Sequence, residues 1–538
     1  MSWDKLPGRF PELEVRAERR TLEGQSGGFR ITKFRGAWQE RLTARVASIL
    51  SALALVAAVA SLAAAAPSRG GDPDPSFGSA GLVTTDLTSD ADRACCVAMQ
   101  ADGKIVVAGS EASVNGSAGH AFVARYLPNG TLDSSFGGSG VVRPRFSTGD
   151  DLVQALAIQP DGKIVAAGSV VAPDTNIALA RYNADGGLDA GFGSGGKVIT
   201  AFAPSSRERA LAASIAGDGK IVVAGAARGG GLPSGNFLVA RYNPDGTLDQ
   251  AFGSGGKVIT DFGSLAEAHG VAIDAGGKIV AVGGMFSVSP AGGFWGKAFV
   301  AARYNQDGTI DTSFGGGKVL TDFGTDSYAN DVTVQRDGKV LTVGWVGAGN
   351  SPGTIVRHNP DGSLDASFGE GGRVVLELPE AGSFIGAVAL DSHERIVTAG
   401  NVGGANIDFE LARFKPNGDL DAAFGRGGAV STNFAGNSYD TASDIALQQD
   451  GKPILAGESD GKIALARYLP TYCFVPNVKG KPLAAAKAAI LKAQCAVGRV
   501  TRISSRTVRT GRVVRQLPRA GTQQREGRAV ALVVSRGR

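Results

Sequence analysis

The chain repeats one phrase of sequence seven times, and this repetition constrains the fold more strongly than any other feature. The clearest copy, ARYNPDGTLDQAFGSGG, runs from residue 240 to 256, and a second phrase of the form DGKIVVAG recurs between the copies. Self-similarity at a fixed period is typical of propellers, solenoids and other arrays. A Phe-Gly element marks the repeats at Phe77, Phe136, Phe192, Phe252, Phe314, Phe368 and Phe424.

Each repeat predicts about four short strands. Alternating apolar residues such as Val153, Ala155 and Ala157 indicate the first strand, and a PDG turn followed by an apolar run indicates a second strand paired with it. The ARY segment, a turn at 243–246 and the GGKVIT segment supply the other two strands, with glycine providing the positive φ of the tight turns. We therefore expect a mainly β fold, a seven-bladed β-propeller of four-stranded blades. A long β-solenoid is the alternative.

The two ends of the array predict how the ring closes. The array opens with the Phe-Gly element at 74–78 without a preceding ARY segment, and it ends with an ARY segment at 466–468 without a following Phe-Gly element. The first and last pieces can therefore complete one blade between them. Such a non-covalent clasp would remove the exposed sheet edges.

The strings ARYNPDGTLDxxFGxGGKV and PDGKIVVAG resemble the delta-60 repeat, a bacterial β-propeller domain of unknown function. The resemblance covers roughly 72–470. It implies a fold and very little biochemistry.

The N-terminal part predicts export. Residues 1–45 form a polar extension with 10 basic and 6 acidic side chains, and residues 46–68 are an uncharged, largely apolar run. A basic flank, an apolar stretch and a small-residue Ala64-x-Ala66 site are typical of a signal peptide cleaved near Ala66. The run is also long enough to span a bilayer of roughly 30 Å, so an uncleaved transmembrane anchor stays as the alternative. Both interpretations place the propeller outside the membrane.

Residues 471–538 predict a small separate domain. A helix is expected after Pro482, with Leu483, Ala486, Ile490 and Ala493 as its apolar stripe. Three strands are expected at 498–504, 511–518 and 528–535. One helix on a small sheet gives an α+β domain.

This segment resembles a PASTA domain. The resemblance rests on Val475-Pro476-Asn477-Val478-x-Gly480, Ala486, Cys495-x-Val497-Gly498, Gly511-x-Val513, Pro518-x-Ala520-Gly521 and Val533-Val534-Ser535-x-Gly537. PASTA domains belong to bacterial membrane kinases and penicillin-binding proteins and are associated with peptidoglycan fragments. The resemblance therefore implies association with the cell wall.

The charge of this segment makes the same prediction independently. Residues 471–538 carry 15 basic and 1 acidic side chains, a net +14, whereas residues 46–470 carry a net −13. Outside a cell, so basic a module is attracted to peptidoglycan or another anionic wall polymer, and export argues against nucleic acid. The expected contact surface is an arginine fringe formed by Arg502, Arg506, Arg509, Arg512 and Arg515. The alternative is a basic face that serves only solubility.

The four cysteines suggest one disulfide. Cys473 and Cys495 flank the predicted helix, and a bond between them would brace a domain too small for a large core. Cys95 and Cys96 are neighbours on a predicted strand, so we expect them to face opposite ways, one of them in the core. A strained vicinal disulfide is the alternative.

The loops between the DGKIVVAG and ARY segments differ most between repeats, and varied loops on a rigid frame are natural binding surfaces. The fourth is the longest and carries Phe286, Phe294 and Trp295, and Trp345 begins the fifth. We expect these aromatic residues to contact an unknown protein or glycan. The alternative is that they cap the blade cores.

Catalytic motifs are not apparent. The histidines His120, His269, His358 and His393 are scattered without metal-ligand spacing, and no unique polar residues stand out for the centre of the ring. An aspartate recurs at Asp133, Asp189, Asp249, Asp311, Asp365 and Asp421, and it is expected to bond backbone N–H groups at a turn. Calcium is the alternative role for these carboxylates; no other cofactor or metal is expected.

The sequence thus predicts a secreted or anchored, cell-wall-associated binding scaffold rather than an enzyme. The PASTA module would attach to the wall, and the propeller loops would bind a partner. An extracellular propeller hydrolase or lyase and a purely structural surface protein are the alternatives.

Overall fold

The computed structural model describes residues 69–537 apart from 89–90, 112–118, 147–150, 172–173, 204, 230, 232–235, 289–293, 348–351, 377–381, 404–405, 437, 494 and 526–527. The predicted signal peptide or anchor and the polar extension before it lie outside these residues. Within them, no helix combines the length and apolar character that a bilayer span requires.

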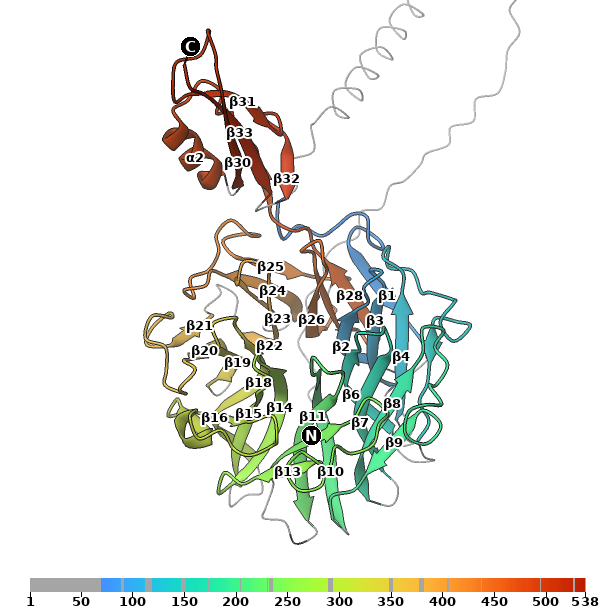
Figure 1. Cartoon of the computed structure of the whole chain (residues 1–538). Helices are drawn as coiled ribbons and strands as arrows, with labels where there is room; N and C mark the ends of the chain where they lie inside the picture. The colour runs from blue at the N-terminus through green and yellow to red at the C-terminus, as the bar shows by residue number, and fades with distance from the viewer. Residues whose placement is uncertain are drawn as a thin grey trace, which may run out of the picture. The chain divides into compact units, whose positions relative to one another are not determined.

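Seven four-stranded antiparallel sheets account for the repeats. Each sheet runs in order from its first strand to its fourth, and the first strand is the one nearest the centre of the ring (Figure 1). The first three sheets contain β2 (Asp92–Met99), β3 (Ile105–Glu111), β4 (His120–Tyr126), β5 (Val141–Val142); β6 (Asp151–Ile158), β7 (Ile164–Val171), β8 (Thr175–Tyr182), β9 (Lys197–Thr200); and β10 (Ser206–Ile215), β11 (Ile221–Gly229), β12 (Asn236–Tyr242), β13 (Lys257–Thr260).

The next three sheets follow the same pattern. They contain β14 (Leu265–Ile273), β15 (Ile279–Val288), β16 (Phe294–Tyr304), β17 (Lys318–Asp322), preceded by the short 3-10 turn η1 (Gly315–Gly317); β18 (Ser327–Val334), β19 (Val340–Val346), β20 (Gly353–His358), β21 (Arg373–Val375); and β22 (Ser383–Leu390), β23 (Ile396–Val402), β24 (Asp408–Phe414), β25 (Ala429–Thr432).

The seventh sheet joins the two ends of the array. It contains β26 (Asp440–Leu447), β27 (Pro453–Ser459), β28 (Lys462–Arg467) and, as its fourth strand, β1 (Leu82–Thr85) from the start of the chain. β1 pairs antiparallel with β28, with Leu82 opposite Ala466. The predicted clasp is therefore present.

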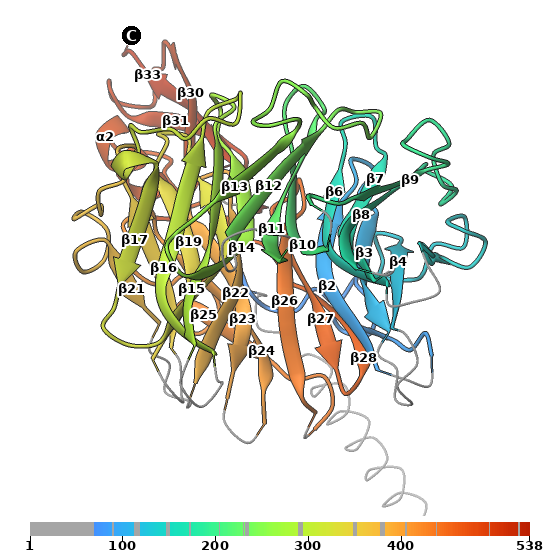
Figure 2. The ribbon, with the colours of Figure 1, turned by 90° about the horizontal axis from the view of Figure 1, so that it is seen from below.

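The first strands of the seven sheets form a closed ring. Each of β2, β6, β10, β14, β18 and β22 lies against the first strand of the next sheet, and β26 lies against β2. Figure 2 shows the same strands from the side, with β26 next to β2 although they begin and end the array. This arrangement confirms the seven-bladed propeller.

The final glycine of the DGKIVVAG phrase is required by a β-bulge. In each sheet the register of the first and second strands shifts by one residue, as between Ala442 and Asp444. The bulge directs a carbonyl of the first strand at the glycine opposite, so that a Cβ at Gly457 would lie 1.9 Å from the carbonyl oxygen of Thr441. The same clash, at 1.7 to 2.0 Å, arises in the other six sheets, at Gly109, Gly168, Gly225, Gly283, Gly344 and Gly400. No other residue fits this position without a shift of the backbone.

The ARY and LDxxFG phrases meet in a buried ion pair that also joins neighbouring sheets. The Nε of Arg125 donates to Oδ2 of Asp133 at 2.8 Å, and the guanidinium lies 4.6 Å from the centre of the Phe136 ring. Lys104, from the DGK phrase, adds a second cation 3.2 Å from Asp133. Corresponding pairs are Arg181–Asp189, Arg241–Asp249, Arg303–Asp311, Arg357–Asp365, Arg413–Asp421 and Arg467–Asp74.

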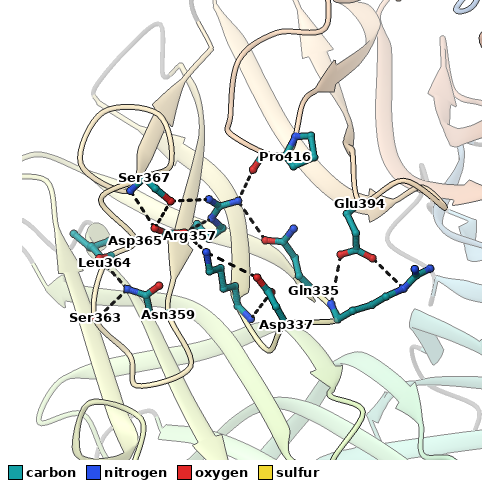
Figure 3. A network of polar contacts seen from close by, with 12 residues as sticks. Gln335, Asp337, Arg357, Asn359, Ser363, Leu364, Asp365, Ser367, Glu394 and Pro416 are labelled. Atoms are coloured by element: carbon teal, nitrogen blue, oxygen red, sulfur yellow. Dashed lines mark hydrogen bonds and ion pairs between the residues drawn. The ribbon is translucent and has the colours of Figure 1, made fainter. Parts of the chain in front are cut away.

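Figure 3 shows one of these pairs at the junction of two sheets. Arg357 contacts Asp365 and Ser367 of its own repeat and also donates to the carbonyl oxygen of Pro416, which lies in the turn after β24. Asp365 also accepts the backbone N–H of Ser367, as expected for a turn aspartate. The same carboxylate also forms ion pairs with Lys339 and Arg357.

The tyrosine of the ARY phrase bonds to the preceding sheet. Tyr242 donates its hydroxyl hydrogen to Oγ1 of Thr200 on β9 at 3.0 Å. Where the tyrosine is replaced by His358, the ring lies 3.0 Å from Thr321 in the same way. These contacts explain why the fourth strand usually ends in threonine.

The C-terminal segment forms a separate small fold. The helix α2 (Leu483–Lys492) covers a sheet of order β30–β33–β31, formed by β30 (Ala496–Ile503), β31 (Val513–Leu517) and β33 (Ala529–Ser535). A second pair joins β29 (Tyr472–Phe474) to β32 (Gln523–Arg525). Ala486 and Ile490 of the helix are buried in this core, which confirms the predicted α+β domain.

Candidate functional site

The inner strands carry the part of the repeat that varies in chemistry. One position on each inner strand, two residues before the extra residue of the bulge, carries six different residue types in the seven sheets although the neighbouring phrases repeat. These positions are Arg93, Leu152, Arg209, Glu267, Tyr328, Phe384 and Thr441. The expectation that no unique polar residue marks the centre of the ring is therefore wrong.

Three of these positions lie together. Arg209 on β10, Glu267 on β14 and Tyr328 on β18 belong to three successive sheets, and their inner strands are adjacent in the ring. Their side chains gather with four others at the end of the ring where the variable loops begin. We call this set the rim cluster: Arg209, Arg228, Glu267, His269, Phe286, Tyr328 and Trp345.

The aromatic half of the rim cluster is centred on Tyr328. Its ring is stacked on Trp345, with centroids 6.3 Å apart and an interplanar angle of 20°, and meets His269 edge to face at 4.8 Å. Phe286 lies 5.2 Å from the same ring at 48°. Tyr328 comes from β18, Trp345 from β19 and Phe286 from β15, so two sheets build this group. All three aromatic residues are half-buried, which leaves part of each ring exposed.

Gly284 holds the tyrosine ring in this position. A Cβ at Gly284 would lie 2.2 Å from the Tyr328 ring, so the ring occupies the space that any other residue would fill. Since the backbone of Gly284 is not in the left-handed region, the requirement for glycine is one of packing.

The charged half of the rim cluster is centred on Glu267. Its carboxylate forms an ion pair with Arg228 on β11 and lies 3.4 Å from Nε2 of His269. Burial raises the pKa of Glu267, but His269 and the charges of Arg228 and Arg209 outweigh it and hold the pKa below its usual value. Burial and the nearby Glu267 charge raise the pKa of the Tyr328 phenol, so the phenol stays protonated at physiological pH.

The structure brings together two of the four aromatic residues expected from the variable loops. Phe286 and Trp345 both contact Tyr328. Phe294 and Trp295 begin β16 and pair with Val288 and Ser287, and their side chains lie outside the described residues. The role of these residues in binding a partner stays a prediction.

The five arginines expected at the cell wall do not form one face. Arg502 pairs with Val534, whose side chain is in the core, whereas Arg515 pairs with Val533, the next residue of β33. Adjacent residues of a strand point to opposite faces, so these two arginines do as well. Arg506 and Arg509 lie in the connection between β30 and β31 and are exposed, and Arg512 donates to the carbonyl oxygen of Gly480.

Both cysteine pairs are bonded in the structure. Cys473 and Cys495 are joined with their Cα atoms 5.2 Å apart. Cys95 and Cys96 form the vicinal disulfide that the sequence left as the alternative. Cys95 is the extra residue of the bulge on β2, where the alternation of side chains is interrupted.

Sequence reasoning missed five members of the rim cluster: Arg209, Arg228, Glu267, His269 and Tyr328. A usable signal exists, because each ring position lies nine residues before the first position of the DGK phrase. An alignment of the seven repeats on that phrase shows this position as variable, whereas the positions of the neighbouring phrases are occupied by similar residues.

The chain matches two protein-family models. The repeats match the model described as "Domain of unknown function (DUF5122) beta-propeller" at residues 100–136, 159–192, 216–252, 277–314, 335–368 and 395–424. Residues 474–536 match the PASTA domain. These matches agree with both resemblances seen in the sequence.

Three solved structures illustrate the similarity to known folds. An extracellular domain assigned to a one component system, BT4673 from B. thetaiotaomicron, is 12% identical with a TM-score of 0.37, over 74% of this chain and 41% of that one. This chain therefore spans less than half of that protein. An ulvan lyase of family PL25 is 12% identical with a TM-score of 0.41, over 72% and 96%. An alpha-L-arabinanase from Penicillium chrysogenum is 13% identical with a TM-score of 0.39, over 62% and 99%. At these scores, none of them assigns an activity to this chain.

Proposed function

Starting from a chain that is a β-propeller of DUF5122 repeats with a C-terminal PASTA domain, we propose that this protein is an exported, cell-wall-associated binding scaffold. The PASTA domain binds peptidoglycan or another anionic wall polymer, and the propeller presents its variable loops to a partner. The N-terminal signal peptide or membrane anchor directs export.

The observation that carries this proposal is the separation of charge along the chain. A basic domain with 15 basic and 1 acidic side chains follows a propeller region of net −13. An anionic polymer attracts the basic domain over a long range, whereas it repels the negatively charged propeller. The two parts therefore divide the work of attachment and recognition.

The test is co-sedimentation of the full chain with purified peptidoglycan at low and at physiological salt. In the test variant, Arg502, Arg506 and Arg509 are replaced by Gln. A control variant loses the same charge elsewhere on the domain, at Lys487, Lys492 and Arg519, all of which are exposed. We expect the test variant alone to lose sedimentation at physiological salt, because exposed charges are screened beyond ~8 Å there. Equal loss in both variants would mean non-specific attraction, and no loss in either would refute attachment through this domain.

A second candidate is an extracellular hydrolase or lyase. It is favoured by one observation, the approach of His269, Glu267 and Tyr328 to one another at the rim. If the protein turns over a wall glycan, His269→Asn should abolish turnover while binding is kept. A binding scaffold shows no turnover with either chain.

A further inference from the structure

The rim cluster carries more positive charge than its own side chains neutralise. Arg207 on β10 lies directly opposite Arg228 on β11 in the strand register, and Arg209 is two residues further along the same face of β10. Like charges directly opposite each other on neighbouring strands are destabilising. Glu267 forms an ion pair with Arg228 and also interacts with the charge of Arg209, so one carboxylate serves two guanidinium groups of the rim cluster.

The excess of positive charge at the rim cluster contrasts with the net negative charge of the propeller region. Residues 46–470, which contain the propeller, have a net charge of −13. Arg207 and Arg209 are exposed, and neither forms an ion pair or hydrogen bond within the part of the chain that the structure describes. A paired guanidinium elsewhere in the repeat is buried against its aspartate, as Arg241 is against Asp249. Arg207 and Arg209 are thus available to an external anion.

The aromatic half of the cluster defines the rest of the ligand. Half-buried faces of Phe286, Tyr328 and Trp345 adjoin Glu267 and His269, which can accept and donate hydrogen bonds. Apolar rings interleaved with a few polar groups fit a ligand that is apolar on its faces and carries hydroxyl groups at its edge. A sugar ring has this character. Guanidinium groups suit a carboxylate, which they can bind through two parallel hydrogen bonds.

We infer that the rim cluster binds an acidic sugar residue of a saccharide chain. Arg209 holds the carboxylate, the aromatic residues contact the face of the sugar ring, and Glu267 accepts hydroxyl hydrogens. This inference deepens the proposed function, since it names the class of partner that the propeller recognises. It is independent of the PASTA domain, which binds by its own charge.

The test uses trigalacturonate as the probe and its fully methyl-esterified form as the matched neutral ligand. Binding to the full chain is measured by titration calorimetry and by tryptophan fluorescence at physiological salt. Because the basic tail also attracts acids, every measurement is repeated on a chain with Arg502, Arg506 and Arg509 replaced by Gln. We expect the acidic probe to bind both chains and the ester to bind at least about tenfold more weakly, equivalent to ~1.4 kcal/mol.

The variants locate the site. Arg209→Gln and Trp345→Ala should each weaken binding of trigalacturonate by about tenfold or more. The control is Arg336→Gln, which removes an exposed arginine paired with Glu394 at the opposite end of the strands. Gly284→Ala should displace the Tyr328 ring and weaken binding without removing any polar group. Circular dichroism and thermal unfolding confirm that each variant is folded.

Three outcomes would overturn the inference. The first is equal binding of trigalacturonate and its methyl ester. The second is unchanged binding of trigalacturonate in both Arg209→Gln and Trp345→Ala. The third is tighter binding of an aspartate-rich peptide than of trigalacturonate, which would make the ligand a peptide. No binding of trigalacturonate up to about 10 mM, weaker than any affinity a specific site would need, also contradicts it. The wall proposal is judged separately by peptidoglycan sedimentation, so either can fail without the other.

Discussion

Arg467 and Asp74 lie 393 residues apart in the sequence, yet the Nε of Arg467 donates to Oδ2 of Asp74 at 2.9 Å. The pair is buried, and Lys452 adds a second cation 2.8 Å from the same carboxylate. It repeats the ion pair found within every other repeat, but here its two halves come from the two ends of the array. The ring is closed by the same contact that organises each repeat.

Asp74→Ala should therefore destabilise the closing sheet. It leaves a buried guanidinium without its partner, which typically costs about 3–5 kcal/mol. Hydrogen exchange followed by mass spectrometry should show faster exchange in β1, β26, β27 and β28. Asp249→Ala, which breaks the matching pair inside one repeat, should instead loosen β10 to β13, and the exposed Asp102→Ala is the control. Unchanged exchange in the closing sheet of Asp74→Ala would contradict this account.

The same pair predicts sensitivity to acid. Burial raises the pKa of Asp74, but its hydrogen bonds to Lys452 and Ser76 and the Arg467 charge outweigh this and lower the pKa to about 2. A carboxyl with a lowered pKa in the folded state stabilises it above the unfolded value near 4, and this contribution is lost as the pH falls towards 2. The thermal midpoint should drop across this window, and less steeply in Asp74→Asn.

Asp444 predicts the opposite pH dependence. It lies on the inner strand β26 and accepts the backbone N–H of Val97 on β2 at 2.8 Å. Burial, with the nearby Asp331 charge, raises its pKa to about 7. The folded state then binds a proton that the unfolded state has lost, so stability falls as the pH rises from about 4 through 7.

Asp444→Asn should remove this dependence while its amide oxygen still accepts the Val97 N–H. We expect the variant to match the parent at about pH 4 and to be more stable at pH 8, measured by urea unfolding. The exposed Asp419→Asn is the control. If the variant is less stable than the parent at pH 8, ionised Asp444 does not destabilise the folded state and the prediction is wrong.

The Tyr182 hydroxyl should contribute nothing to the free energy of unfolding. The fourth strand of the preceding repeat places Pro144 where others have threonine, and the Tyr182 hydroxyl is buried without a partner in the described structure. Tyr182→Phe should be neutral or stabilising, whereas Tyr242→Phe, which breaks the bond to Thr200, should cost about 1 kcal/mol. Chemical unfolding of both variants distinguishes them. Equal losses would refute this explanation.

Gly457 tests the bulge. Gly457→Ala sets a Cβ 1.9 Å from the Thr441 carbonyl oxygen and should cost about 2 kcal/mol or more. Gly217→Ala has no heavy atom within 4 Å of its Cβ and should change stability by no more than about 0.5 kcal/mol. Thermal unfolding of the two variants is the measurement. Similar midpoints would mean that the bulge relaxes freely.

The two disulfides should respond differently to removal. Cys473 and Cys495 are separated by 22 residues, so their bond restricts the unfolded chain by about 3 kcal/mol in the chain-entropy model. The bond between Cys95 and Cys96 closes almost no loop and gives almost no such gain. Replacing both members of each pair by Ser, with unfolding of the C-terminal domain and the propeller followed separately, tests this. Peptide mapping of the parent by mass spectrometry should find both bonds.

The amino-acid sequence was enough to predict the number of sheets, the order of their strands and the way the ends meet. These follow from local patterns that recur in each repeat: alternating apolar residues, glycine turns and an array that begins and ends with half a phrase. The C-terminal helix and its three strands were predicted for the same reason. Short-range geometry dictates such features, and repetition reduces the ambiguity of each.

Which residues the sheets bring together could not be predicted from these local patterns. Arg209, Glu267 and Tyr328 are far apart in sequence and become neighbours because the inner strands of three sheets converge on one axis. The unpaired hydroxyl of Tyr182 likewise depends on how one sheet packs on the next. The vicinal disulfide depends on the bulge in β2, which interrupts the regular alternation of side chains that a strand is expected to have. Contacts between sheets depend on how the sheets pack, and such contacts do not produce a periodic pattern in the sequence.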